Sequence, residues 1–220
     1  MSQFYVIGLT GKKGAGKDSA AAIVQRMAAA EGHGFAKFAF ADPIRREFMS
    51  IVGAKTEADY DRIKRSTATV HGNSKQDPVT EIAMREVMRG IGMLMRSYDE
   101  NQFVEYVRKQ ILAEYQKHIR DRVPNGKNTY VCITDVRFAN EVAMLHADFA
   151  ATIIHIVNPN DKSADSHVTE QGLPPHTIDT VIENPRNDDL PVDVVPNRAY
   201  EFGALVADRI HRFVHHSPYN

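Results

Sequence analysis

The residues best suited to chemistry lie near the N-terminus, where glycines, a lysine and a serine follow a short apolar run. Residues 11–19 read Gly-Lys-Lys-Gly-Ala-Gly-Lys-Asp-Ser, and Tyr-Val-Ile precedes them at 5–7. A helix-like stretch rich in alanine follows at 20–27. A strand, a glycine loop, a Gly-Lys pair, a hydroxyl and a helix, in this order, are typical of a phosphate-binding loop.

The physical basis of this interpretation is local. Gly11, Gly14 and Gly16 tolerate backbone angles that other residues resist, so the loop can turn its N–H groups inward around an anion. The helix that begins near Lys17 adds unpaired N–H groups and the positive end of its dipole. We therefore expect a polyphosphate to bind at the loop, with these residues around it: Gly11, Lys13, Gly14, Ala15, Gly16, Lys17, Asp18 and Ser19.

One position departs from the usual pattern. Asp18 stands where Ser or Thr normally follows the lysine, and Ser19 comes one residue later. We expect the shifted hydroxyl of Ser19 to be one ligand of a magnesium ion.

A second polar group follows a buried strand in the middle of the chain. Residues 129–134 are apolar, aromatic or β-branched, and Asp135 and Arg137 follow them. The carboxyl ends of parallel strands are where ligands of open sheets bind. We therefore predict that Asp135 is directed toward the metal and that Arg137, with Lys17, acts on phosphates. A structural role for Arg137, paired with Asp135 or Glu141, is the alternative.

Hydrophobic spacing predicts the elements that position these groups. Strands are expected at 5–7, 37–40, 129–134, 151–157 and 179–184, and helices at 17–31, 43–53, 80–96, 101–120, 138–149 and 198–214. Asp42 is expected to cap the helix that Pro43 begins. The polar stretch 55–80 is interpreted as an insert or loop, and 158–178 as a lid that carries Lys162, His167 and Glu170. His155 is interpreted as a core or edge histidine, and His211 and His215 as part of a solvated helix face.

Composition narrows the class of protein. The chain has 220 residues, a formal charge of −1 and one cysteine, so neither a nucleic-acid polymer as partner nor an internal disulfide is indicated. It contains no apolar run of membrane-spanning length and no leader-like segment. We expect a soluble cytoplasmic protein, located in the host cytoplasm if it is viral, with no membrane partner. A homodimer is left open.

Several segments together resemble one family, the phage-type deoxynucleoside monophosphate kinases, and more distantly phosphomevalonate kinase and dephospho-coenzyme A kinase. The segments most specific to this family lie toward the C-terminus, at 162–174 and 179–184. The others are the phosphate loop and the stretches at 40–45, 85–92 and 135–141.

The resemblance implies an α/β P-loop kinase fold, with a parallel five-stranded sheet flanked by helices. The whole chain would form one domain, with a core at about 1–41 and 126–220 and a helical acceptor-binding portion at about 42–125. It implies ATP on the loop, Mg2+ as cofactor, and a deoxynucleoside 5′-monophosphate as acceptor. Asn184 would lie near the adenine. The acceptor would meet Asp42, Ile44, Arg45, Arg85, Arg89 and Arg96. Arg89 replaces a glutamine that is common in the family, so base preference does not carry over directly.

Two other functions remain open from the residues alone. The acceptor could be another small phosphate ester, since phosphomevalonate kinase shares the Asp-x-Arg and late Asn features. The chain could instead be a P-loop ATPase or a regulatory switch. Neither an Asn-Lys-x-Asp guanine motif nor a second acid beside Asp135 is present to favour that class.

Overall fold

A computed structural model describes residues 2–70, 80–120, 126–160, 172–184 and 195–216. The chain divides into two compact units. The first contains Met1–Phe40 and Val107–Asn220, and the second is the uninterrupted stretch Ala41–Tyr106. Among the described residues, no helix is long and apolar enough to cross a membrane.

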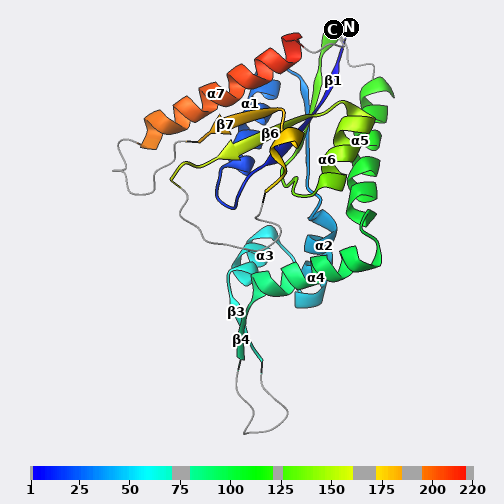
Figure 1. The fold of residues 1–220 in the computed structure, drawn as a ribbon, viewed down its shortest axis with the longest axis vertical. Helices are drawn as coiled ribbons and strands as arrows, with labels where there is room; N and C mark the ends of the chain where they lie inside the picture. The colour runs from blue at the N-terminus through cyan, green and yellow to red at the C-terminus, as the bar shows by residue number, and fades with distance from the viewer. Residues whose placement is uncertain (1, 71–79, 121–125, 161–171, 185–194, 217–220) are drawn as a thin grey trace. The chain divides into compact units, whose positions relative to one another are not determined.

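The first unit is built on a five-stranded sheet in which all neighbouring strands are parallel (Figure 1). The strand order is β2-β5-β1-β6-β7, so the strand that is first in sequence is central. These strands are β1 Phe4–Thr10, β2 Gly34–Phe38, β5 Thr129–Ile133, β6 Thr152–Val157 and β7 Thr180–Glu183. The α/β class and the parallel five-stranded sheet that the family resemblance implied are confirmed.

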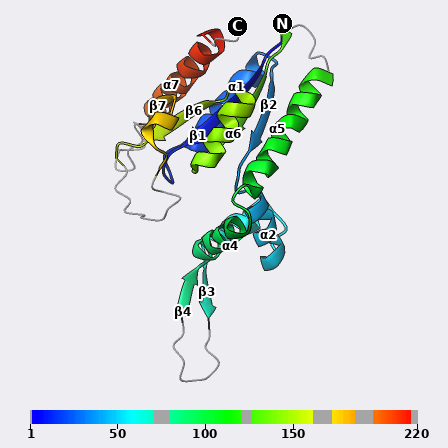
Figure 2. The same cartoon turned by 45° about the vertical axis from the view of Figure 1, so that its right-hand side comes forward.

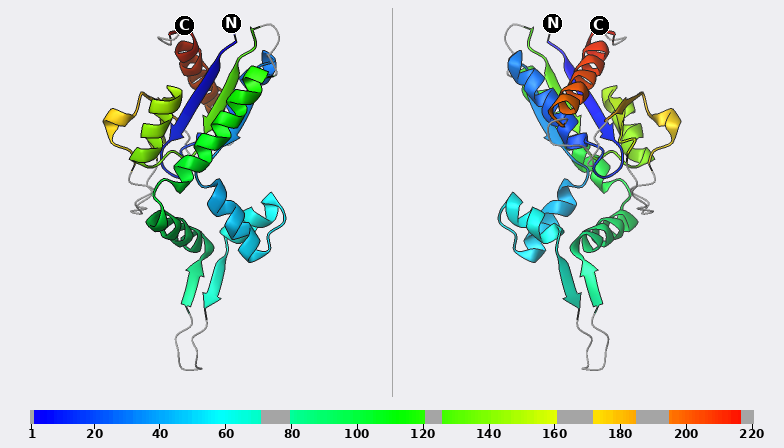
Figure 3. Two further views of the ribbon diagram at one scale, coloured as in Figure 1. Left: turned by 90° about the vertical axis from the view of Figure 1, so that its right-hand side faces the viewer. Right: turned by 90° about the vertical axis from the view of Figure 1, so that its left-hand side faces the viewer.

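Helices cover both faces of this sheet, which explains why its central strands are almost continuously apolar. Helices α1 (Lys17–Ala30) and α7 (Val195–His216) lie on one face, and α5 (Gln102–Arg120) and α6 (Ala139–Phe149) on the other (Figure 3). The core beneath α1 and α7 joins strand residues to helix residues; it includes Ile7, Leu9, Ile154, Ile156, Ile23 and Phe202. Cys132 is fully buried in β5, and burial raises the pKa of its thiol to about 12.

The second unit combines helices with a small antiparallel pair of strands. Its helices are α2 (Asp42–Val52), α3 (Glu57–Lys64), α4 (Met84–Tyr98) and the beginning of α5. Figure 2 shows strands β3 (Thr67–Val70) and β4 (Thr80–Ala83) running side by side. Helices α2 and α4 approach closely at Gly92, where an added Cβ would lie 2.7 Å from Ile44 Cδ1.

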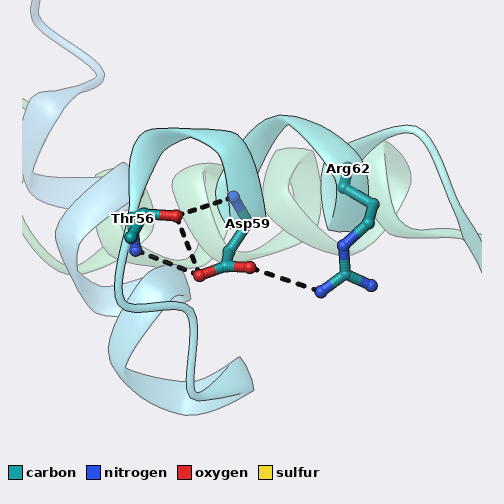
Figure 4. A network of polar contacts seen from close by, with 3 residues as sticks. All are labelled: Thr56, Asp59 and Arg62. Atoms are coloured by element: carbon teal, nitrogen blue, oxygen red, sulfur yellow. Dashed lines mark hydrogen bonds and ion pairs between the residues drawn. The ribbon is translucent and has the colours of Figure 1, made fainter.

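A capping box begins α3 inside the stretch that the sequence analysis treated as a loop. Thr56 Oγ1 accepts the N–H of Asp59 at 3.1 Å, and the Asp59 carboxylate accepts the N–H of Thr56 at 3.2 Å (Figure 4). Arg62 lies on the other side of Asp59, with its Nη2 3.5 Å from Oδ1. The hydrogen bond from the Thr56 side chain is the main cause of the lowered pKa of Asp59. The reciprocal cap satisfies two N–H groups and lets a polar eight-residue segment form a helix.

Several predicted boundaries were wrong. The second strand runs over Gly34–Phe38 rather than 37–40, because Gly34 pairs with Thr129 instead of ending the preceding helix. Asp42 does not cap α2. The helix begins at Asp42 itself, with Ala41 as N-cap and no side-chain cap bond, so the charge of Asp42 lies in the first turn, where it favours the positive end of the helix dipole.

The predicted insert at 55–80 contains α3 and β3, and the helix expected from Thr80 begins at Met84, after β4. The remaining predicted helices and strands are present, with ends displaced by a few residues at most.

Candidate active site

The loop between β1 and α1 has the backbone that its glycines were expected to provide. Gly11, Gly14 and Gly16 have φ angles of 136°, 79° and 107°. Side chains could not replace two of them, because a Cβ at Gly11 would lie 2.2 Å from the Ile156 carbonyl oxygen and one at Gly16 would lie 2.4 Å from Asn184 Nδ2. The loop is therefore shaped by contacts with the ends of β6 and β7 as well as by its own sequence.

Lys17 is the first residue of α1, and its ammonium group turns back across the loop. Its Nζ donates hydrogen bonds to the carbonyl oxygens of Gly11 and Lys12, at 2.6 and 2.7 Å. Gly16 precedes it as an N-cap without a side-chain cap bond, so the first turn of α1 keeps N–H groups for an anion. This arrangement places a cation and a helix N-terminus at one loop, which suits a bound phosphate.

Asn184 fixes the middle of the loop. Its buried side-chain amide donates to the Ala15 carbonyl oxygen at 2.8 Å, and its backbone N–H donates to the Val157 carbonyl at 2.7 Å. The family resemblance implied that Asn184 lies beside the adenine. The structure shows in addition that Asn184 contacts the phosphate loop at Ala15. Asn184 thus connects β7, β6 and the phosphate loop.

The polar residues after Lys17 lie at the surface. The carboxylate of Asp18 is 3.5 Å from Lys37 Nζ, and both side chains are largely exposed, so this ion pair contributes little stability. Ser19 is exposed on the first turn of α1, and Lys13 is exposed on the loop. All three can reach a ligand without disturbing the core.

Two carboxylates hold the backbone around Arg137. Asp135 Oδ1 accepts the N–H of Phe40 at 2.7 Å. Fully buried Glu141 accepts the N–H of Arg137 at 2.7 Å and that of Phe138 at 3.1 Å. From the sequence, Glu141 was named only as a possible partner of Arg137 and its capping role was missed, although its place three residues after the N-cap Phe138 is a capping position. Hydrogen bonds to these two carboxylates therefore fix the backbone on both sides of Arg137.

The two residues expected to meet a magnesium ion, Ser19 and Asp135, each carry an oxygen donor. In the part of the chain described, no group of three or more His, Cys, Asp or Glu residues could hold a metal by itself. Mg2+ is commonly bound by one or two protein oxygens together with substrate phosphates, and Ser19 and Asp135 can supply these. Mg2+ would neutralise phosphate charge there.

His155, interpreted from the sequence as a core or edge histidine, is half-buried in an interior strand of the sheet, next to the strand that leads into the loop. It is in register with Thr10, the last residue of β1 before the loop. The pKa of His155 is lowered, first by burial and then by the nearby positive charge of Lys17. Strand alternation alone could not reveal this position, since it depends on the parallel pairing of β6 with β1.

In the second unit, three of the six predicted acceptor residues act on Tyr60. The Arg45 guanidinium lies 4.8 Å from the centre of its ring and forms an ion pair with Glu57. Burial raises the pKa of Tyr60; Arg45 and Arg85 oppose this shift, and Asp42 adds to it. Asp42, Arg45 and Arg85 therefore act on one buried hydroxyl. Glu57 and Tyr60 were missed because α3 was not expected.

The other two arginines of α4 have partners on or near that helix. Arg89 Nη1 lies 2.7 Å from Glu86 Oε1 and is mostly buried. Arg96 lies 4.7 Å from the ring centre of Phe103. Arg45 makes the same kind of contact with Tyr60, so the two arginines differ in the ring they cover and not in the type of interaction. The lid residues Lys162, His167 and Glu170 lie outside the described residues.

Comparison with known proteins gives the family. The family model described as deoxynucleotide monophosphate kinase matches residues 55–190. The chain belongs to this family. The matched range does not include the phosphate loop, so the loop geometry and the family match are independent observations.

Individual members of the deoxynucleotide monophosphate kinase family are also similar. The enzyme of that name from Enterobacteria phage T4 is 30% identical over 130 residues, which cover 56% of this chain and 50% of the relative. The match thus spans half the length of the T4 protein. A protein of Acanthamoeba polyphaga mimivirus, provisionally given the same name, is 26% identical over 170 residues, covering 76% and 81% of the two chains.

One solved structure aligns along most of its length. It is a mutant of the Mycobacterium tuberculosis APS kinase CysC, with 12% identity, a TM-score of 0.30, and coverage of 92% of this chain and 98% of that one.

Proposed function

We propose that this protein transfers the γ-phosphoryl group of ATP to a deoxynucleoside 5′-monophosphate and releases ADP and the diphosphate. The observation that carries the proposal is the phosphate loop, with Lys17 lying across it, in a chain of the deoxynucleotide monophosphate kinase family. In the transfer, an oxygen of the acceptor phosphate bonds to the γ-phosphorus as the bond to the bridging β–γ oxygen breaks.

The residues of the first unit serve the donor. Loop N–H groups and the N-terminus of α1 hold the phosphates of ATP, and Lys17 leaves the Gly11 and Lys12 carbonyls to pair with the outer ones. Arg137, held in place through Glu141 and Asp135, neutralises charge that donor and acceptor share during transfer. No side-chain nucleophile is required, because the acceptor phosphate itself attacks.

The second unit serves the acceptor. Arg45 and Arg85, together with Tyr60, can bind a phosphate monoester by charge and hydrogen bonding. Arg89 lies on the same helix as Arg85 and is proposed to contact the base. The lid residues Lys162, His167 and Glu170 are proposed to close over both substrates and exclude water.

A panel of acceptors tests this function. The protein is incubated with ATP and Mg2+ and with each deoxynucleoside monophosphate, the ribonucleoside monophosphates, mevalonate phosphate and dephospho-coenzyme A, and each product is identified. We expect at least one deoxynucleoside diphosphate to form, and folded Lys17→Ala to lose about a hundredfold or more of that activity. Turnover of only a non-nucleotide ester, or hydrolysis of ATP that no acceptor stimulates, would contradict the proposal.

A further inference from the structure

His155 lies near the carboxyl end of β6, in register with Thr10, and the proposed mechanism does not use it. It lies in β6, one residue before Ile156, whose carbonyl oxygen lies against Gly11. Ile154 and Ile156 point into the core shared with α1 and α7. Because successive side chains of a strand alternate, His155 lies on the opposite face, beside Thr10 at the carboxyl edge.

The imidazole has a polar atom that the protein does not satisfy. Nδ1 of His155 is buried, and in the part of the chain that the structure describes it has no hydrogen-bond partner. Leaving a buried polar atom unpaired is unfavourable, and such atoms are few in native proteins. The buried imidazole of His118 shows the usual solution, since its Nδ1 lies 2.9 Å from Thr129 Oγ1.

The charge nearby indicates which kind of partner His155 would accept. Lys17 is close enough for its positive charge to oppose protonation of the ring, and burial acts in the same direction. The neutral ring carries one N–H donor, and a donor beside a cation suits an anionic oxygen. The same lysine is the group proposed to meet the outer phosphates of ATP.

We propose that His155 Nδ1 donates a hydrogen bond to the outermost phosphate of the nucleotide on the loop and so helps to position that phosphate. This inference rests on the proposed function, since it takes ATP as the ligand of the loop. His155 is then a third side chain at the transferred group, together with Lys17 and Arg137. His155 would donate as a neutral imidazole, whereas Lys17 and Arg137 are cations.

Three substitutions separate this role from a structural one. The substitutions are His155→Asn, His155→Gln and His155→Leu. The side-chain nitrogen of Asn is the same number of bonds from Cα as His Nδ1, and the side-chain nitrogen of Gln is the same number of bonds from Cα as His Nε2. His155→Leu removes the unpaired atom, so we expect an equal or higher melting temperature, together with about a tenfold loss of affinity for a non-hydrolysable ATP analogue. His155→Asn should keep most of the affinity, and His155→Gln should resemble His155→Leu.

The opposite pattern overturns the inference. A merely structural histidine predicts a lower melting temperature for His155→Leu with unchanged affinity for the analogue. Equal affinities for the Asn and Gln variants would also contradict a specific role for Nδ1.

Nitrogen NMR of histidine-labelled protein gives a test on the unsubstituted chain. Addition of the ATP analogue should shift the Nδ1 resonance of His155 more than ADP does, because ADP lacks the outermost phosphate. His118, bonded to Thr129, and His146, 3.0 Å from Asp179, serve as internal controls that should change little.

If the analogue binds and the His155 resonance does not move, the inference is wrong and the proposed function stands. If calorimetry detects no binding of the analogue to the wild-type loop, the proposed function and the inference fail together.

Discussion

The side-chain amide of Asn184 donates a hydrogen bond to the carbonyl oxygen of Ala15, a residue 169 positions earlier in the chain. The contact joins the end of β7 to the middle of the phosphate loop. The space between them has no room for another atom, because a Cβ on Gly16 would lie 2.4 Å from the same amide nitrogen. The conformation of the loop therefore depends on a distant residue as well as on its own glycines.

Gly16→Ala should damage the site more than Gly14→Ala. Both glycines have positive φ, but only the Cβ at Gly16 meets Asn184; at Gly14 it would meet no described atom within 4 Å. We expect Gly14→Ala to cost about 1 kcal/mol of unfolding free energy, from backbone strain alone. Gly16→Ala should cost about 2 kcal/mol or more and should also weaken ATP binding. Denaturant unfolding and calorimetry measure both effects, and equal losses would contradict the Asn184 contact.

Arg137→Lys tests the charge contributed at the strand end. Lysine keeps the charge but cannot present a planar fork to two oxygens, so we expect kcat to fall by about a hundredfold while the melting temperature stays near that of the wild type. Glu141→Gln is the matched structural variant, because Glu141 accepts the N–H groups of Arg137 and Phe138 while fully buried. It should lower the melting temperature. A destabilised Arg137→Lys protein with normal turnover per folded molecule would assign Arg137 a structural role.

Stability should fall in mildly acidic solution because of two histidines. Burial lowers the pKa of His118 and of His155 in the folded protein below the ordinary value of 6.5. The unfolded chain therefore binds more protons below that pH, and the unfolding free energy decreases as pH falls from about 6.5 through the folded-state pKa values. Urea unfolding between pH 8 and pH 5 measures this, and His155→Leu should reduce the slope. A slope of opposite sign below pH 6.5, or no effect of the substitution, would contradict the assignment.

Arg89→Gln should change the choice of base more than the binding of ATP. Arg89 is mostly buried and paired with Glu86 on α4, so its loss alters a fixed side chain of the proposed acceptor pocket. We expect the relative kcat/KM values for the four deoxynucleoside monophosphates to be reordered, with the KM for ATP nearly constant. Arg62→Gln is the control, because Arg62 is largely exposed and only loosely paired with Asp59. An unchanged base profile for Arg89→Gln would exclude Arg89 from base recognition.

The parts of the fold that could be predicted from the sequence are those determined by local chemistry. The glycines at 11, 14 and 16 permit the positive φ angles of the loop, and the β-branched and aromatic content of 129–133 indicates a buried strand. The signal for α3 was also local, since Thr56 and Asp59 have the spacing of a capping box. It was missed because the segment around them is polar.

Other features depend on contacts between distant residues and could not be read from spacing. Gly34 looked like a helix terminator but is a strand residue, because it pairs with Thr129. His155 looked like an ordinary strand histidine until the pairing of β6 with β1 placed it beside Thr10. The Asn184 contact with Ala15 is of the same kind, since nothing in either local sequence refers to the other.

The order of the strands has a consequence for synthesis on the ribosome. β1 and β2 are made first but do not pair with each other, since β5 lies between them and β6 lies on the other side of β1. Until residues 129–157 have been translated, the nascent chain carries an apolar strand with two open edges, which is the kind of segment that aggregates. Within the sheet, folding of the nucleotide-binding unit is thus delayed until more than half of the polypeptide exists. During that interval, a ribosome-associated chaperone that binds β1 would protect the nascent chain from aggregation.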